Sequence, residues 1–173
     1  MTMLCWVYYK GQDGPLLDYR TAGRAGVHLC VESGQLYVHF TSLNYPSNIP
    51  ILRHTALAGS WKFVGASFDH STGDAKLWVN GAVVYTLNIG EGLELATQDS
   101  VRMGVYDQRY FKGRIAQMQV YDKALTQEQI QAIQQQTVAG EYVTNQKIPV
   151  EACTFGESNW LFSDVQFLLL VFT

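Results

Sequence analysis

The sequence predicts an all-β fold, a jelly-roll sandwich of two antiparallel sheets with one short helix near its C-terminal end. Short apolar runs alternate with turn residues from Met3 to Val120. Two of the turns, Ser33-Gly34 and Asn80-Gly81, lie between apolar runs, as the turns of β-hairpins do. A single helix-start signal follows at Thr126. A smaller antiparallel barrel is the alternative architecture.

The composition is that of one globular domain with few charges. The chain has 173 residues, and we expect residues 1–140 to form the domain. Charged residues make up only 16% of the full chain, against roughly 25% in a typical globular domain. A neutral polar surface is common among extracellular β domains, so we expect an extracellular or cell-surface setting within a larger protein. The net charge of −3 and the lack of a basic cluster argue against a nucleic-acid partner.

The termini and the cysteines add further expectations. Met1 leads almost directly into a strand-like run, so no secretory signal is expected in this chain. No apolar run reaches the roughly 18 residues of a membrane span. Three cysteines (Cys5, Cys30 and Cys153) without CxxC spacing argue against a zinc ribbon. They leave open one bridge with a free thiol or three free thiols, and the sequence leaves the oligomeric state open.

The first elements are a strand at residues 3–9, a turn at 10–15 and a short strand at 16–19. A hairpin then covers residues 27–40, centred on Ser33-Gly34. This register opposes His28 to His39, and it places alternate apolar residues on one core face. The other face is chemically mixed and is formed by His28, Cys30, Glu32, Gln35, Tyr37 and His39.

The middle of the chain predicts three antiparallel strands between residues 61 and 87. The Asn80-Gly81 turn opposes Val79 to Ala82, Trp78 to Val83, and Leu77 to Val84. Both faces of this hairpin carry apolar bulk, which favours a central position in the sandwich over an edge. A short edge strand is expected just before it, at residues 49–53, after a loop at 41–50.

The last part of the domain predicts strands at residues 100–105 and 111–120, followed by a helix. Thr126 is a good N-cap with Gln129 at the capping-box position, and the helix should end near Gln136. Residues 141–173 form a C-terminal extension whose final apolar run is either a closing strand or an unstructured tail.

Several short motifs follow one another along the chain. They are Cys5–Tyr8, Trp61–Val64, Asp74–Gly81, Phe111–Ile115, Val120–Thr126 and Glu128–Ile130. They resemble the aromatic-Trp-Val strand, the W-x-x-V and L-x-V-N-G hairpin, and the closing F-x-G-x-I and helix signature of laminin-G-like and pentraxin-like domains of the concanavalin A-like lectin and glucanase superfamily. The resemblance covers roughly residues 3–136 and implies the jelly-roll fold. Domains of this kind usually have a further strand or two before the Trp6 strand.

The resemblance implies a non-catalytic module that binds glycan or protein through loops at its rim. The glycosidases of this superfamily carry two Glu around an Asp on one strand. This chain lacks that pattern, since Glu91 and Glu94 lie three residues apart in a glycine-rich loop. A glycan-active hydrolase of the same fold and a purely structural domain are the alternatives.

The candidate ligand-binding residues lie in predicted loops. Tyr45, Tyr106 and Tyr110 offer ring faces to a sugar, and Gln108 lies beside them. Asp107 matches the position of a Ca²⁺ ligand in the resembled family. Because Ca²⁺ takes six to eight oxygens, one carboxylate alone is not a site, and a solvated turn residue is the alternative.

The His28/His39 pair is a second possible metal site. Opposed side chains have Cβ atoms about 5 Å apart, which is close enough to share a transition metal. Two half-exposed histidines on a polar sheet face are the alternative, and the one we favour.

Overall fold

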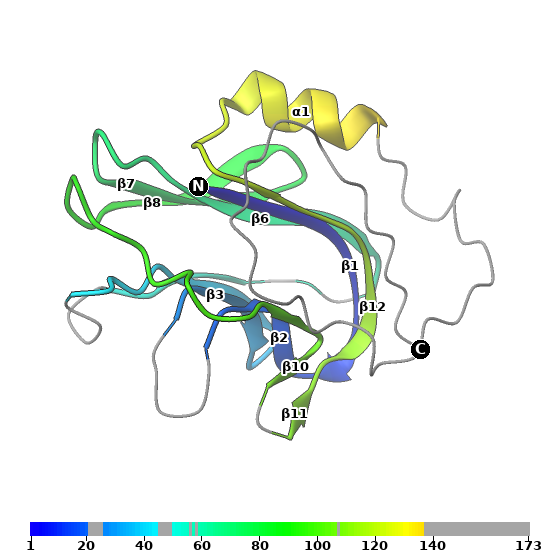
Figure 1. The fold of residues 1–173 in the computed structure, drawn as a ribbon. Coiled ribbons are helices and arrows are strands. Elements are labelled where there is room, and N and C mark those ends of the chain that lie inside the picture. The colour runs from blue at the N-terminus through cyan, green and yellow to red at the C-terminus, as the bar shows by residue number, and fades with distance from the viewer. Residues whose placement is uncertain (21–25, 45–49, 56, 58, 107, 137–173) are drawn as a thin grey trace.

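The computed structural model describes residues 1–20, 26–44, 50–55, 57, 59–106 and 108–136. In this part of the chain, two five-stranded antiparallel sheets lie face to face (Figure 1). The first sheet has the order β12 (Lys112–Tyr121), β1 (Thr2–Gln12), β6 (Trp61–Phe68), β7 (Asp74–Val79) and β8 (Ala82–Asn88). The second has the order β5 (Leu52–Thr55), β4 (Gln35–His39), β3 (His28–Glu32), β2 (Gly14–Asp18) and β9 (Arg102–Met103).

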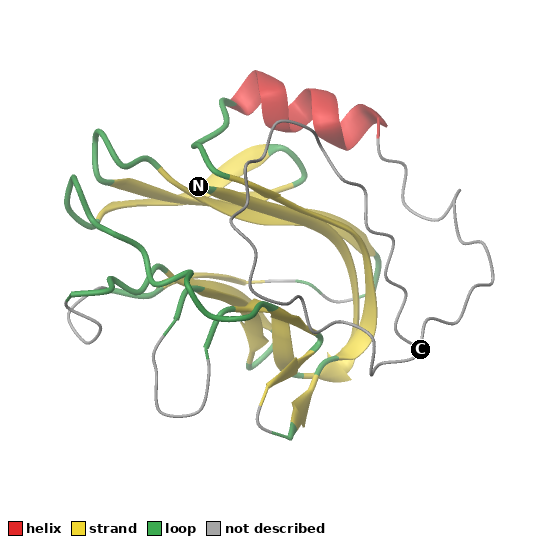
Figure 2. Cartoon of the chain, in the orientation of Figure 1, coloured by secondary structure: helices red, strands yellow, loops and turns green. Residues whose placement is uncertain are grey.

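Two smaller elements complete the fold. A two-stranded ribbon joins β10 (Val105–Tyr106) to β11 (Arg109–Tyr110), and α1 covers Gln127–Gln136. Figure 2 shows that strands dominate and that α1 lies above the first sheet. The predicted all-β sandwich of two antiparallel sheets with one short helix is therefore confirmed. The predicted extension at 141–173 lies outside the described residues.

The main core lies between the two sheets. The register of β3 with β4 is the predicted one, with His28 opposite His39 and Val31 opposite Leu36. Because side chains alternate between faces, Leu29, Val31 and Val38 all point into this core, where they are 0–2% exposed. They meet Val7 and Phe68 from the first sheet, among others. The hairpin at residues 27–40 was thus predicted correctly in both turn and faces.

A smaller core lies on the outer side of the first sheet, where α1 covers it. Leu125 and Ile130 pack there against Leu4, Phe63 and Trp78. The capping box is formed as predicted. The Gln129 Oε1 accepts the Thr126 backbone N–H at 2.9 Å, and the Gln129 backbone N–H donates to the Thr126 Oγ1 at 3.3 Å. The helix covers Gln127–Gln136, and the residues after Gln136 lie outside the described part of the chain.

The β7–β8 hairpin differs from the prediction in two ways. Trp78 pairs with Val83 as expected, but a β-bulge shifts the next pair, so that Leu77 opposes Tyr85 rather than Val84. The expected central position is wrong, because β8 forms the edge of its sheet, with Val83 37% and Tyr85 42% exposed. The apolar bulk on both faces of β7 has another cause: one face meets the main core and the other meets α1.

Two other predicted boundaries are corrected. The expected turn at residues 10–15 is mostly strand, because β1 continues to Gln12 and β2 begins at Gly14. Asp13 alone separates them, and its carboxylate accepts the Ser33 and Gly34 backbone N–H groups of the β3–β4 turn. The strand expected at 100–105 is broken at Gly104, whose φ of 72° lies in the left-handed region.

Two of the three cysteines are described, and both are buried free thiols. Cys5 faces the main core and Cys30 faces the opposite side of the second sheet. Burial raises the pKa of each thiol to about 12, so both are protonated near neutral pH. Cys153 lies outside the described residues. No helix among the residues that the structure describes has the length and apolar character to span a membrane.

The fully buried Thr2 ties the first strand to the start of the helix. Its Oγ1 donates to the Lys123 carbonyl at 2.7 Å and accepts the Leu125 backbone N–H at 2.9 Å. We predict that Thr2→Val, which keeps the shape and removes both hydrogen bonds, lowers the free energy of unfolding by about 2 kcal/mol. The measurement is urea denaturation.

The matched control is Thr86→Val on the exposed edge strand β8. Valine is well tolerated at such a position, so the control should change the free energy of unfolding by less than about 0.5 kcal/mol. Equal effects of the two substitutions would contradict the role of Thr2.

Candidate binding face

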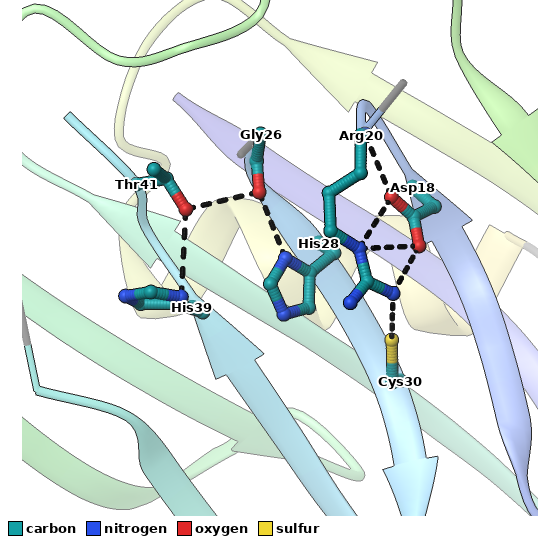
Figure 3. Close-up of polar contacts among 7 residues, drawn as sticks. All are labelled: Asp18, Arg20, Gly26, His28, Cys30, His39 and Thr41. Atoms are coloured by element: carbon teal, nitrogen blue, oxygen red, sulfur yellow. Dashed lines mark hydrogen bonds and ion pairs between the residues drawn. The ribbon is translucent and has the colours of Figure 1, made fainter. Parts of the chain in front are cut away.

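The outer side of the second sheet carries an unusual set of polar and charged side chains. Strand alternation turns them away from the main core. We call this surface the polar face and define it by Asp18, Arg20, His28, Cys30, Glu32, Tyr37, His39 and Arg53. Figure 3 shows how Asp18, Arg20, His28 and Cys30 lie in it. Despite their direction, Asp18, His28 and Cys30 are 0–6% exposed, so neighbouring side chains cover them.

Asp18 and Arg20 form the most constrained contact of the polar face. The Arg20 Nε donates to both carboxylate oxygens of Asp18, at 3.0 and 2.9 Å, and its Nη2 donates to Oδ2. The Arg20 backbone N–H adds a fourth hydrogen bond at 2.7 Å. Burial by itself lowers the pKa of Arg20, but the hydrogen bonds and charge of Asp18 outweigh it and raise that pKa. The pair is therefore a fixed ionic clamp at the end of β2.

The clamp brings the β10–β11 ribbon onto the polar face. The Arg20 guanidinium lies 4.2 Å from the centre of the Tyr106 ring, a cation–π contact. Figure 1 shows the ribbon projecting from the second sheet on the side away from the first. The Arg20 Nη2 also reaches the Cys30 Sγ at 3.9 Å. One guanidinium thus joins a carboxylate, an aromatic ring and a thiol.

The two histidines lie side by side and are held by a chain of hydrogen bonds. Their ring centres are 5.4 Å apart and the rings are nearly perpendicular. The Gly26 carbonyl accepts from the His28 Nδ1–H at 2.8 Å and from the Thr41 hydroxyl at 3.0 Å (Figure 3). Since that hydroxyl donates to Gly26, its oxygen accepts from the His39 Nδ1–H at 3.4 Å. Both rings then carry their hydrogen on Nδ1 and keep Nε2 as an acceptor.

The expectation of two half-exposed histidines is wrong for His28, which is 6% exposed. Burial first, and then the Arg20 charge, lowers the pKa of His28 to about 4. Among the residues that the structure describes, no three His, Cys, Asp or Glu side chains gather as metal ligands need to. With this lowered pKa, His28 is neutral near pH 7, and its Nδ1–H donates to the Gly26 carbonyl.

Tyr37 forms the middle of the polar face. Its ring lies edge-on to His28 at 5.5 Å, and the Arg53 guanidinium lies 5.2 Å from its centre. Arg53 also pairs with Glu32 at 2.7 Å, and both of these side chains are 43% exposed. Exposure makes this second ion pair weak, since solvent screens it. Arg53 and Glu32 are thus accessible to a ligand, in contrast to the clamp beneath.

The rim residues expected from the sequence fall into two groups. Tyr106 lies under Arg20, whereas Tyr110 is 56% exposed. Within the ribbon, Tyr106 pairs with Arg109 and Tyr110 with Val105, so strand alternation places the two rings on opposite sides. Gln108 is exposed in the turn, with φ of 62°. Tyr45 and Asp107 lie outside the described residues, and the ligand roles of all five stay predictions.

Sequence reasoning missed the clamp. Asp18 and Arg20 lie two residues apart at the end of a short apolar strand, which is a weak signal because turns commonly carry such pairs. A buried carboxylate needs a partner, but its burial is visible only once β3 and β9 flank β2. Arg53 was also missed, because its position opposite Tyr37 depends on the pairing of β4 with β5.

Comparisons with known proteins agree with this architecture. A family model described as the concanavalin A-like lectin/glucanases superfamily, of the laminin-G type, matches residues 1–131. No curated protein matches the sequence. Solved structures share the fold at low identity, which by itself shows the fold alone.

Three of these structures illustrate the kinds of protein that share the fold. A Bacteroides ovatus protein proposed to bind carbohydrate is 17% identical (TM-score 0.59); the match covers 75% of this chain and 39% of that one. The Ruminococcus gnavus IT-sialidase CBM40, bound to α2,3 sialyllactose, is 19% identical (TM-score 0.60; 76% of this chain, 80% of that one). The binding domain of botulinum neurotoxin DC, in complex with rat synaptotagmin II, is 15% identical (TM-score 0.56; 76% and 34%).

The buried His28 makes stability depend on pH. Its pKa is about 4 in the folded state and about 6.5 when unfolded, so between these values the unfolded state binds more protons. Stability should therefore fall as the pH drops from about 6.5 to about 4, by up to ~3 kcal/mol from this group. His28→Asn keeps a hydrogen-bond donor near Gly26 but does not titrate. We predict that it makes the free energy of unfolding less dependent on pH between about 4 and 6.5.

The measurement is urea denaturation at a series of pH values. Thr86→Val on the exposed strand β8 changes no titratable group, so it is the control and should leave the slope unchanged. A slope that is the same in wild type and His28→Asn would show that His28 is not buried as a neutral group.

Proposed function

Because the chain belongs to the concanavalin A-like lectin and glucanase superfamily, we propose that it is a non-catalytic recognition module that binds a glycan on the polar face. The observation that carries the proposal is the Arg20–Asp18 clamp, which holds Tyr106 against a face with histidine, tyrosine and arginine side chains. A buried ion pair stabilises a fold little compared with apolar residues of the same size. The desolvation cost of burying Asp18 is easier to understand if the ion pair fixes the shape of a binding surface.

The polar face offers the groups that a sugar ring needs. A pyranose has an apolar C–H side and hydroxyl groups that both donate and accept hydrogen bonds. Tyr106 supplies a half-buried aromatic ring, and the exposed Arg53 and Glu32 supply a donor and an acceptor. Tyr37 is only 9% exposed and supports the Arg53 guanidinium from beneath. His39 is half-buried beside them. Perturbed titratable groups gathered on one face also favour a binding role.

The structural relatives support this proposal without naming the ligand. One of them is bound to sialyllactose and another is in complex with a protein. We favour a glycan over a protein because the polar face combines aromatic rings with small hydrogen-bonding groups. The large aliphatic residues of the second sheet point into the core instead. We also propose an extracellular or cell-surface setting, on the basis of the low charge content of 16%.

A glycan array, followed by titration of any ligand found, tests the proposal. We predict that Arg53→Ala weakens binding about tenfold or more, since it removes a charged hydrogen-bond donor from the face. Arg114→Ala is the matched control. Arg114 is also exposed, but it lies on β12 in the other sheet, so its removal should leave the affinity unchanged.

Other outcomes would replace the proposal. Equal affinity in wild type and Arg53→Ala would move the ligand away from the polar face. Hydrolysis of a β-glucan panel that is lost on replacing a single Glu would make the protein an enzyme. A complete lack of saturable ligands would favour a purely structural domain.

The Ca²⁺ ion expected at Asp107 forms a separate proposal. The described residues do not provide a set of three metal-ligating side chains, so the site depends on Asp107 and on backbone carbonyls. We predict that millimolar Ca²⁺ raises the thermal unfolding midpoint of the wild-type protein, because a ligand of the native state stabilises it. Asp107→Ala should abolish the rise. No rise in the wild type would remove the metal from the proposal.

A further inference from the structure

A second polar surface lies on the opposite side of the molecule, between α1 and the β7–β8 turn. It is a groove of about 520 Å³ lined by Trp6, Asn80, Gln131, Gln134 and Gln135. We propose that this groove binds a neutral saccharide, independently of the polar face. Its volume falls within the range of small-molecule sites, and its lining consists of one indole ring and four side-chain amides.

The groove is held in shape by the helix resting on the turn. Gly81 has φ of 73°, and a Cβ added there would lie 2.6 Å from the Gln134 Oε1. The Gln131 Nε2 donates to the Gly81 carbonyl at 3.2 Å. On the strand side, the Asn80 Oδ1 accepts the Phe63 backbone N–H at 3.2 Å. These contacts join α1 to the first sheet and orient two of the amides.

The oriented amides leave complementary groups for a ligand. With its oxygen bound to Phe63, the Asn80 amide has its NH₂ group as the donor. With its nitrogen bound to Gly81, the Gln131 amide has its oxygen as the acceptor. The exposed Gln135 side chain makes no hydrogen bond to any other described residue and carries both a donor and an acceptor. Donors and acceptors side by side match hydroxyl groups, which act as both.

The aromatic rings in and beside the groove also favour a saccharide. Trp6 is half-buried and packs on Phe63, with ring centres 5.3 Å apart. The next residues on the same sheet face, Tyr8 and Trp61, are also half-buried and lie 5.9 Å apart. Alternate strand residues repeat about every 6.7 Å, so the row presents more than one ring along β1. The apolar C–H side of a sugar packs well on such rings.

The absence of charge from the groove lining selects among saccharides. None of its five lining residues is ionisable. An acidic sugar would lose hydration there without gaining a cationic partner, whereas neutral hydroxyl groups find amide partners. We therefore expect neutral saccharides, rather than acidic ones, to bind the groove.

The experiment titrates the ¹⁵N-labelled full chain with a panel of neutral trisaccharides: maltotriose, cellotriose, mannotriose and chitotriose. The readout is the ¹H–¹⁵N spectrum, followed at the Trp6 indole and the glutamine side-chain amides. We expect at least one sugar to shift the Trp6 signal saturably. Gln131→Ala and Gln135→Ala should each weaken that binding about fivefold or more.

The matched control is Gln127→Ala, an exposed glutamine on the same helix outside the groove. It should leave the affinity unchanged, as should Arg53→Ala on the polar face. No Trp6 shift with any panel sugar at about 10 mM, a concentration that would populate even a weak millimolar site, overturns the inference. So does an affinity that neither glutamine variant changes. Because the two surfaces have different test residues, loss of one binding activity is distinguishable from loss of the other.

Discussion

The pairing of β1 with both β12 and β6 is the constraint on which the rest of the structure depends. It places the first strand inside the first sheet, between a strand near the end of the domain and one from its middle. Thr2 then anchors the start of α1 through two buried hydrogen bonds. The helix closes the outer core and, by resting on the β7–β8 turn, shapes the amide-lined groove. The position of β1 thus supports both the main core and the groove on the outer side of the same sheet.

The two proposed binding surfaces lie on opposite sides of the sandwich and differ in physical character. The polar face is built around an ion pair whose carboxylate is fully buried, so its shape depends on keeping Asp18 and Arg20 together. The groove is neutral and is held by single hydrogen bonds between side chains and backbone. Both carry aromatic rings beside hydrogen-bonding groups. Because the surfaces face away from each other, a module with both is suited to two separate ligands.

Most of the local structure was predictable because it depends on short-range rules. The Ser33-Gly34 turn set the register that opposes His28 to His39, and Thr126 with Gln129 started the helix. The prediction of strand positions failed where packing against residues far away in the sequence decided the structure. The edge position of β8 was missed because an apolar face can meet either a sheet or a helix. Alternation of residues does not distinguish these two partners.

The sequence by itself determined the all-β class, the two hairpins, the helix and its cap, and the superfamily, since each follows from local turn chemistry and the order of motifs. The tertiary structure alone decided which side chains form the candidate binding surfaces. Asp18 is buried because β3 and β9 flank β2, and Arg20 reaches Tyr106 only because the chain returns to β2 more than 80 residues later. The groove likewise joins β1, the β7–β8 turn and α1. Burial and electrostatic partnership are properties of packed surfaces, and local patterns do not encode which surfaces meet.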